Sequence, residues 1–187
     1  VYNNSQSSFA IDINGRLFAW GTNSNAQLGD NTTISRSSPV QIGSYSFTSI
    51  AAYATAAVGI MYENKPLPNL FAWGTATLNG QGANTSSPAL ISTSLAQTVS
   101  SPVQIGTSSW TSISAGLSNS FAIRSDGKLF SWGDNSQLQS GYLTPATMLS
   151  TSNNPNNNAQ SYVRNTDNAL VIWGANDVGQ VGDNTTV

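Results

Sequence analysis

The stretch Leu17-Phe18-Ala19-Trp20-Gly21 decides the fold, because the chain repeats it three more times. It returns at residues 70–74, 129–133 and 170–174, with the tryptophan and the glycine kept in every copy, and a second glycine follows nine residues after each tryptophan. Repetition at a fixed offset is typical of a protein built from structural repeats. The positions that we expect to be structural are Trp20, Gly21, Gly29, Trp73, Gly74, Gly82, Trp132, Gly133, Gly141, Trp173, Gly174 and Gly182.

Each repeat has the pattern of short antiparallel strands. In the first repeat, apolar residues alternate with small or polar ones over residues 9–13, which is the period of a half-buried strand. Asn14-Gly15 predicts a two-residue hairpin turn with positive φ at both residues, and Asp126-Gly127 marks the same turn in the third repeat. The returning strand, residues 16–20, should carry Phe18 and Trp20 on one face and Leu17 and Ala19 on the other.

Two further strands are expected in the first repeat, over residues 39–43 and 47–51. The second repeat duplicates Ser38–Gly43 letter for letter as Ser101–Gly106. Four short strands in about fifty residues suit one blade of a β-propeller. The sequence therefore predicts an all-β chain of about four blades, some incomplete, with repeats over about residues 8–53, 54–116, 117–159 and 160–187.

The chain begins at Val1 rather than Met and stops inside its fourth repeat, so we expect it to be a fragment or the ordered part of a longer propeller. An open stack of blades would expose unpaired strand edges, which favour aggregation. We therefore expect the native object to be closed, either by further sequence or by neighbouring copies.

The composition excludes several classes of function. The chain has no Cys and no His, which excludes Cys/His zinc sites, cysteine nucleophiles and triads that use histidine. Charged residues make up 7% and the net charge is -2, so no basic patch exists for nucleic acid. The sequence contains no apolar run long enough to predict a membrane span. We expect no cofactor, no metal ion and no small-molecule substrate.

One long stretch suggests a family. Residues 121–135, Phe-Ala-Ile-Arg-Ser-Asp-Gly-Lys-Leu-Phe-Ser-Trp-Gly-Asp-Asn, resemble the repeat of the regulator of chromosome condensation family, as do Trp20-Gly21-Thr22-Asn23 and Gln27-Leu28-Gly29. The resemblance extends over about residues 8–186 and implies a β-propeller, usually of seven blades. Low charge and Asn/Ser/Thr-rich loops are similar to the bacterial and bacteriophage members of the family.

The resemblance implies several different functions. The nuclear founding member exchanges nucleotide on a small GTPase and docks on the nucleosome, but this chain has no counterpart of the expected basic arm. Similar repeats occur in secreted bacterial proteins, including an inhibitor of β-lactamase, and in structural proteins of bacteriophages. Fold alone does not select among these functions.

Two alternatives concern particular side chains. The repeated tryptophans could stack against sugar rings, but a tryptophan fixed in a strand and followed by glycine favours packing between blades. The eight carboxylates could include a catalytic pair, but no pair stands out, and Asp30 and Asp183 occupy one repeat position, which suggests a shared loop conformation. We therefore predict a chain that is not an enzyme.

The irregular segments are the candidates for partner binding, because loops on a rigid scaffold commonly carry recognition. They span residues 63–69, 86–100 and 143–158. The individual candidates are Lys65, Tyr45, Tyr53, Tyr142 and Asn156. Their polar, uncharged surroundings suit a hydrogen-bonded and hydrated interface with another protein.

The sequence thus predicts a structural or protein-binding propeller module, with a virion-associated phage fibre, tail or capsid-surface protein as the first interpretation. Neighbouring virion subunits would then be its partners, and its location would be the virion or the extracellular space. The alternatives are a secreted bacterial inhibitor or adhesin and, less favoured, a GTPase nucleotide-exchange factor or a hydrolase with paired aspartates.

Overall fold

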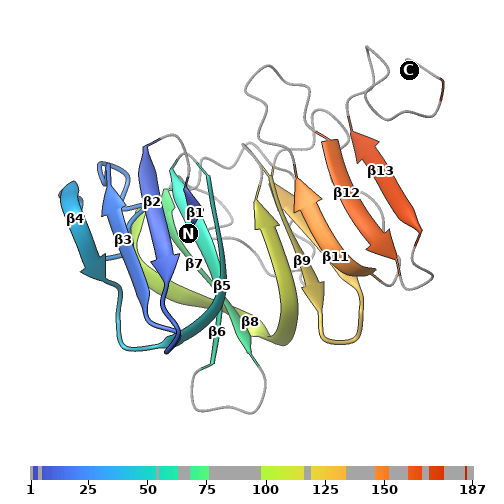
Figure 1. Ribbon diagram of the computed structural model, residues 1–187, viewed down its shortest axis with the longest axis horizontal. Helices are drawn as coiled ribbons and strands as arrows, with labels where there is room; N and C mark the ends of the chain where they lie inside the picture. The colour runs from blue at the N-terminus through green and yellow to red at the C-terminus, as the bar shows by residue number, and fades with distance from the viewer. Residues whose placement is uncertain are drawn as a thin grey trace.

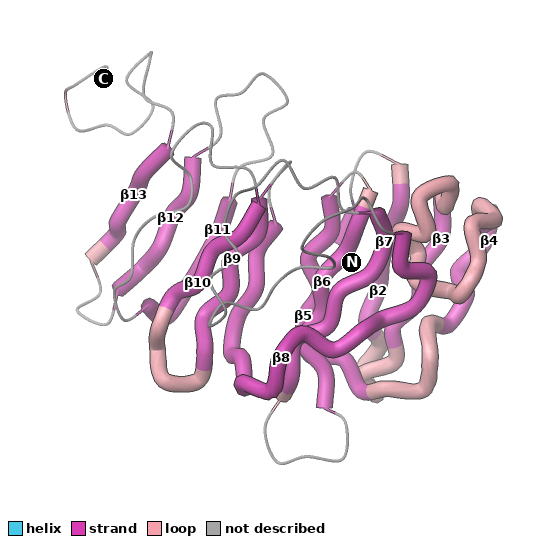
Figure 2. Tube along the Cα trace, turned by 180° about the vertical axis from the view of Figure 1, so that it is seen from behind, coloured by secondary structure: helices cyan, strands magenta, loops and turns pink. Residues whose placement is uncertain are grey.

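The computed structural model describes residues 2–3, 6–53, 55–62, 68–75, 98–115, 119–133, 146–151, 160–165, 169–174 and 184. These residues form antiparallel β-strands and no helix, as Figures 1 and 2 show. The predicted all-β class is therefore confirmed.

The strands form a four-stranded, a six-stranded and a three-stranded sheet in succession (Figure 1). The six-stranded sheet is described below as two sheets, the second and the third, which share one long strand. The first sheet contains β1 (Tyr2–Asn3), β2 (Ser7–Ile11), β3 (Leu17–Gly21) and β4 (Arg36–Gln41), in this order. The second contains β5 (Ser46–Tyr53), β6 (Ala56–Tyr62), β7 (Asn69–Thr75) and the first part of β8 (Thr98–Ala115).

The long strand β8 joins the second sheet to the third. Its residues up to Ser109 pair with β7, whereas Trp110 to Ala115 pair with β9 (Asn119–Arg124), which pairs with β10 (Leu129–Gly133). A last sheet contains β11 (Ala146–Thr151), β12 (Gln160–Asn165) and β13 (Leu170–Gly174). The first strands β1, β5 and β11 and the last part of β8 lie next to one another, so the four sheets meet along this edge as propeller blades do.

The repeated motif takes the same register in every sheet. Trp20, Trp73, Trp132 and Trp173 each lie opposite a small residue of the preceding strand: Ser8, Ala57, Ser120 and Ser161, respectively. The glycine that follows has φ +106° at Gly21 and +99° at Gly74, and a Cβ at Gly74 would collide with the carbonyl oxygen of Thr55. Glycine is required there because an L side chain tolerates neither this φ nor this contact.

Two details of the predicted blade are wrong. Residues 47–51 were expected to complete the first blade, but β5 pairs with β6 and begins the second sheet. A strand can pair with either of its neighbours in the chain, and the sequence pattern does not distinguish the two.

The predicted two-residue turn at Asn14-Gly15 is a three-residue turn. Gly15 N donates to Asp12 O at 3.0 Å and Asp12 N donates to Arg16 O at 3.0 Å, and of the turn residues only Gly15 has a positive φ, +80°. This is a type I turn followed by a left-handed glycine. The third sheet repeats it, with Gly127 N donating to Arg124 O at 2.9 Å and φ +83° at Gly127.

The core lies between the sheets. Leu17 and Ala19 of β3 are buried against the second sheet, together with Phe71 and Trp73 of β7. The other face of β7, Leu70 and Ala72, is buried against the third sheet. Strand β7 therefore has two buried faces. In β3 the predicted alternation is confirmed, and Phe18 and Trp20, on the face turned away from the second sheet, are only half-buried.

Candidate functional site

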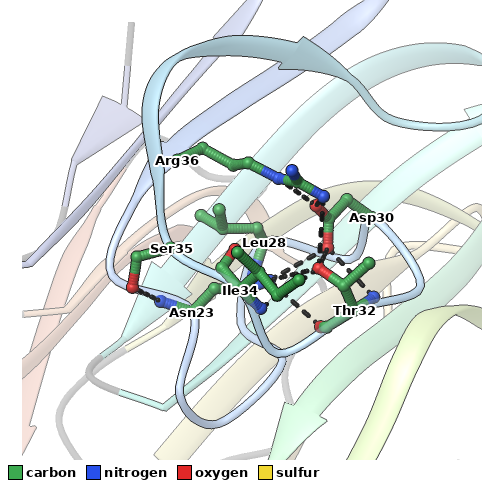
Figure 3. A network of polar contacts seen from close by, with 7 residues as sticks. All are labelled: Asn23, Leu28, Asp30, Thr32, Ile34, Ser35 and Arg36. Atoms are coloured by element: carbon green, nitrogen blue, oxygen red, sulfur yellow. Dashed lines mark hydrogen bonds and ion pairs between the residues drawn. The ribbon is translucent and has the colours of Figure 1, made fainter.

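The loop from Thr22 to Ser35, which connects β3 to β4, is called the repeat loop below, and it is organised around one buried side chain (Figure 3). Asn23 is fully buried, and its Nδ2 donates to Asp30 Oδ1 at 2.9 Å, to Thr32 O at 3.0 Å and to Ile34 O at 3.2 Å. Its Oδ1 accepts a hydrogen bond from Leu28 N at 2.9 Å. The asparagine of the Trp-Gly-x-Asn motif therefore holds both halves of the loop together.

Asp30 completes this network from the other side. It forms an ion pair with Arg36 at 2.6 Å and accepts a hydrogen bond from Thr32 Oγ1 at 2.7 Å (Figure 3). Burial raises the pKa of the Asp30 carboxyl, but hydrogen bonds from Thr32, Arg36 and Asn23 outweigh it, so that the pKa lies below its ordinary value. The partners of Asp30 lie within the repeat loop and at Arg36, the first residue of β4, which is a structural arrangement.

The repeat loop forms the joint between the first two sheets. The indole N–H of Trp73 donates to Gln27 O at 3.0 Å, and Thr75 Oγ1 donates to Asn25 O at 3.1 Å. A Cβ on Gly29 would lie 2.7 Å from Trp73 Nε1, and Gly29 has φ +78°. The Gln-Leu-Gly motif therefore places the Gln27 carbonyl and Gly29, which has no side chain, against the tryptophan of the next sheet.

The same joint continues along β8. Asn31, with φ +62°, donates its N–H to Ser100 O at 2.7 Å, and Ser100 Oγ donates to Asn31 Oδ1 at 3.2 Å. Asparagine adopts the left-handed region more readily than most residues, which suits this position. The repeat loop thus bonds to the next sheet at three separate points.

A second repeated contact lies at the opposite end of the sheets. Phe47 N donates to Gly15 O at 2.8 Å, and Trp110 N donates to Pro68 O at 3.0 Å. Phe47 and Trp110 share one repeat position, so the same backbone bond ties the first sheet to the second and the second to the third. The first two sheets are therefore joined at both ends.

The hairpin face is the end of the molecule at which β2, β6, β9 and β12 finish and their partner strands begin, at the bottom of Figure 1. Ion pairs link Arg16 to Asp12 and Arg124 to Asp126 at 2.6 Å each, on two of these hairpins. The two guanidinium groups also lie over aromatic rings, Arg16 at 5.7 Å from the centroid of Phe18 and Arg124 at 4.8 Å from that of Phe130. Each of these arginines is thus neutralised by a neighbour.

Hydrogen bonds set the acidity of these two aspartates. Arg124 is the main cause that holds the pKa of Asp126 down at about 2. Desolvation raises the pKa of Asp12, but hydrogen bonds from Arg16 and Asn14 lower it overall. Both carboxyl groups are therefore ionised at neutral pH and are unsuited to act as general acids there.

Apolar side chains stand exposed on the same face. Ile13 is 100% exposed at the tip of the first hairpin, Tyr62 is 42% exposed at the end of β6, and Leu170 is 65% exposed at the start of β13. Ile13 and Tyr62 occupy the same repeat position, whereas Leu170 has the repeat position of the buried residues Leu17, Leu70 and Leu129. Sequence reasoning did not single out Ile13 or Tyr62. The available signal was their equivalent position at the ends of the two hairpins.

The predicted site residues have different outcomes. Tyr45 is half-buried and stacks on Phe71 with ring centroids 6.1 Å apart. Tyr53 lies in β5, and Trp132, Gly133, Trp173 and Gly174 lie in β10 and β13. The candidates outside the described residues are Lys65, Tyr142, Asn156, Gly82, Gly141 and Gly182, together with residues 63–67, 86–97, 143–145 and 152–158 of the irregular segments.

The described residues contain no cluster of acidic side chains that could hold a metal ion. They also contain no helix long and apolar enough to cross a membrane.

Comparison with known proteins identifies the repeats. The regulator of chromosome condensation (RCC1) repeat matches residues 14–56 and, in a second family model, residues 110–139. No curated protein sequence matches the chain closely enough to count as a relative. These two segments are therefore similar to the repeat of the regulator of chromosome condensation family.

Solved structures show the same fold. Human WBSCR16 is similar with a TM-score of 0.70 at 16% identity, over 98% of this chain and 49% of that one. Prp20p of Saccharomyces cerevisiae, which has binding properties toward Gsp1p and histones, is similar with a TM-score of 0.73 at 19% identity, over 97% and 45%. Yeast RCC1 (Prp20) bound to Kap60 gives 0.74 at 18%, over 100% and 46%. The chain is a β-propeller protein that spans about half the length of these structures.

Proposed function

We propose that this chain is a non-enzymatic, protein-binding propeller module that engages its partner through the hairpin face. The observation that carries the proposal is the exposure of Ile13 and Tyr62 at the equivalent hairpins of two neighbouring sheets. Exposed apolar side chains that gather on one face of a protein mark interaction sites. Arg16 and Arg124 are each paired with an aspartate of their own hairpin, so the partner that we propose has a neutral or apolar surface.

The setting that we propose is a virion, with neighbouring virion subunits as partners. The support is the composition: a 7% share of charged residues and loops rich in Asn, Ser and Thr suit a rigid frame on the outside of a particle. A secreted binding protein is the alternative, and it differs in one measurable respect. A virion component sediments with a large particle, whereas a secreted binding protein stays in the light fraction.

The test of the binding face uses a photo-crosslinking residue in place of Ile13, with the same residue in place of Val103 as the control. Val103 is 48% exposed on β8, away from the hairpin face. We expect cross-links to one partner from position 13 and none from position 103. Equal labelling from both positions would overturn the hairpin face as the binding site.

The test of the setting is sedimentation of the native source material, with this chain's peptides followed by mass spectrometry. Peptides that travel with a large particle are the expected result. Peptides confined to the light soluble fraction would overturn the virion proposal and leave the protein-binding proposal standing.

A further inference from the structure

The outer strands of the first two sheets contain the same segment. It reads Pro-Val-Gln-Ile-Gly, spans residues 39–43 and 102–106, and is called the outer segment below. Strand β4 lies at the edge of the first sheet (Figure 1). Residues 98–105 of β8 pair with β7, and no other strand among the described residues pairs with them. A free edge of this kind presents backbone groups with which a strand of another molecule could pair.

The register of β4 shows which backbone groups point outward. Ile42 N donates to Leu17 O at 2.8 Å, so this N–H points toward β3. Because the backbone groups of successive strand residues point to opposite sides, Val40 also faces β3, whereas Gln41 and Pro39 face away from it. Proline has no N–H, so the outer edge of β4 lacks a donor at residue 39.

Strand β8 has the same arrangement. Gln104 lies opposite Phe71 of β7, as Gln41 lies opposite Phe18 of β3. Pro102 therefore has its nitrogen on the outer edge, where a donor is missing again.

A register shift interrupts both outer strands beside the proline. Residues 37–39 of β4 lie opposite Trp20 alone, and residues 100–102 of β8 lie opposite Trp73 alone. The extra residues break the regular alternation of backbone groups along the edge, as a β-bulge does. Bulges and prolines on edge strands are two ways in which proteins prevent the addition of a further strand.

The end of the outer segment closes the edge in another way. Gln41 Nε2 donates to Gly43 O at 3.0 Å, and Gln104 Nε2 donates to Gly106 O at 2.8 Å. The two glycines have φ +58° and +61°, so the backbone leaves the extended conformation there. The carbonyl that follows each glutamine residue by two positions is thus already bonded, and it belongs to a residue that cannot continue a strand.

We propose that the outer segment is an edge guard, which keeps the outer strands of the first two sheets from pairing with a strand of another molecule, including a second copy of this chain. An added strand would find a complete donor and acceptor at Gln41 or Gln104 and none at the neighbouring outward positions. Strand pairing needs several such positions in succession. A partner that meets this edge must therefore bind through side chains. This role of the outer segment does not depend on the hairpin face being the binding site.

The first experiment measures amide hydrogen exchange of the 187-residue chain by NMR at low protein concentration. We expect the N–H groups of Gln41 and Gln104 to exchange at least about tenfold faster than those of Val40 and Val103, which point toward β3 and β7. Exchange that is as slow at the two glutamines as at the two valines would show that the outer edge is paired, and would overturn the proposal.

The second experiment restores the missing donors with Pro39→Thr and Pro102→Thr in one variant, and measures its association by sedimentation velocity over a range of concentrations. We expect association to be at least about threefold stronger than in the unsubstituted chain for each restored donor, as for one backbone hydrogen bond. Val103→Thr is the matched control, because it places threonine on the same strand at a 48% exposed position whose N–H points inward. It should leave association unchanged.

Hydrogen exchange of the associated double variant identifies the surface involved. We expect the N–H groups of Gln41 and Gln104 to become protected, because both would lie inside the new strand pairing. A double variant that is folded by circular dichroism and associates no more strongly than the unsubstituted chain would overturn the proposal. Equal strengthening by Val103→Thr, or stronger association that leaves both glutamine N–H groups in fast exchange, would overturn it as well.

Discussion

The two ends of the first sheet use charge in opposite ways. At the loop end, Asp30 and Arg36 belong to a network whose centre is the fully buried Asn23, and the Asp30 side chain is only 6% exposed. At the hairpin end, Arg16 and Asp12 are paired at the same 2.6 Å, but their side chains are 52% and 24% exposed. Equal distances therefore do not mean equal contributions to stability.

The reason is the surroundings of each pair. Water competes for exposed ion pairs, and their net contribution is commonly about 0–1 kcal/mol. A buried polar network is costly to break because each abandoned donor or acceptor stays without water. We infer that the buried network at the loop end contributes more to stability than the exposed ion pair at the hairpin end. The hairpin end still contributes a backbone hydrogen bond to the joint, from Phe47 N to Gly15 O.

The largest effect is expected from Asn23→Ala. It removes the amide that bonds Asp30, Thr32, Ile34 and Leu28, and it leaves buried groups without partners. We expect the free energy of unfolding to fall by about 3 kcal/mol, measured by urea denaturation. Asn14→Ala, at the exposed hairpin tip, is the matched control and should change it by less than about 0.5 kcal/mol. Equal losses of unfolding free energy in Asn23→Ala and Asn14→Ala would contradict the inference that the loop end of the first sheet contributes more to stability than the hairpin end.

The next effect compares two glycines. Gly29 and Gly106 have φ +78° and +61°, so alanine is strained at both, but only at Gly29 would the new Cβ meet the Trp73 indole, at 2.7 Å. Gly29→Ala should cost about 2–3 kcal/mol of stability, and Gly106→Ala about 1 kcal/mol. The difference between the two variants in thermal unfolding isolates the contact across the joint. Equal losses of stability in the two variants would mean that the Trp73 side chain moves to accommodate the new Cβ at little energetic cost.

The repeated motif and its spacing were enough to predict the all-β propeller class and the alternating faces of β3. They did not predict β11, because residues 143–158 lack the repeated Pro-Val-Gln-Ile pattern and were expected to be irregular, whereas residues 146–151 form a strand. They were not enough to assign β5, because pairing partners are chosen by long-range contacts that a local pattern does not contain. The turn at Gly15 was predicted with one residue too few, since an Asn-Gly pair suits both the two-residue turn and the end of a three-residue one.

The role of Asn23 could not be predicted from the sequence for a different reason. An asparagine in a polar loop has no sequence signature of burial, and only the folded loop shows its four partners.

The smallest effect concerns acidity and salt. Both Asp30 and Asp126 have lowered pKa values in the folded protein, so each contributes stability that is present above the unfolded pKa of about 4 and is lost as the pH falls through the folded value. The Asp126 side chain is 43% exposed, against 6% for Asp30, so salt should screen its attraction to Arg124. We expect 1 M salt to raise the pKa of Asp126 from about 2 toward 3.8 and to leave that of Asp30 nearly unchanged, as followed by NMR titration of the carboxyl carbons. Asp30→Asn should accordingly reduce the loss of unfolding free energy at acid pH. Asp126→Asn should hardly change the dependence of the unfolding free energy on pH at high salt. Equal salt sensitivity of the two pKa values would show that water enters the hydrogen-bond network of the repeat loop.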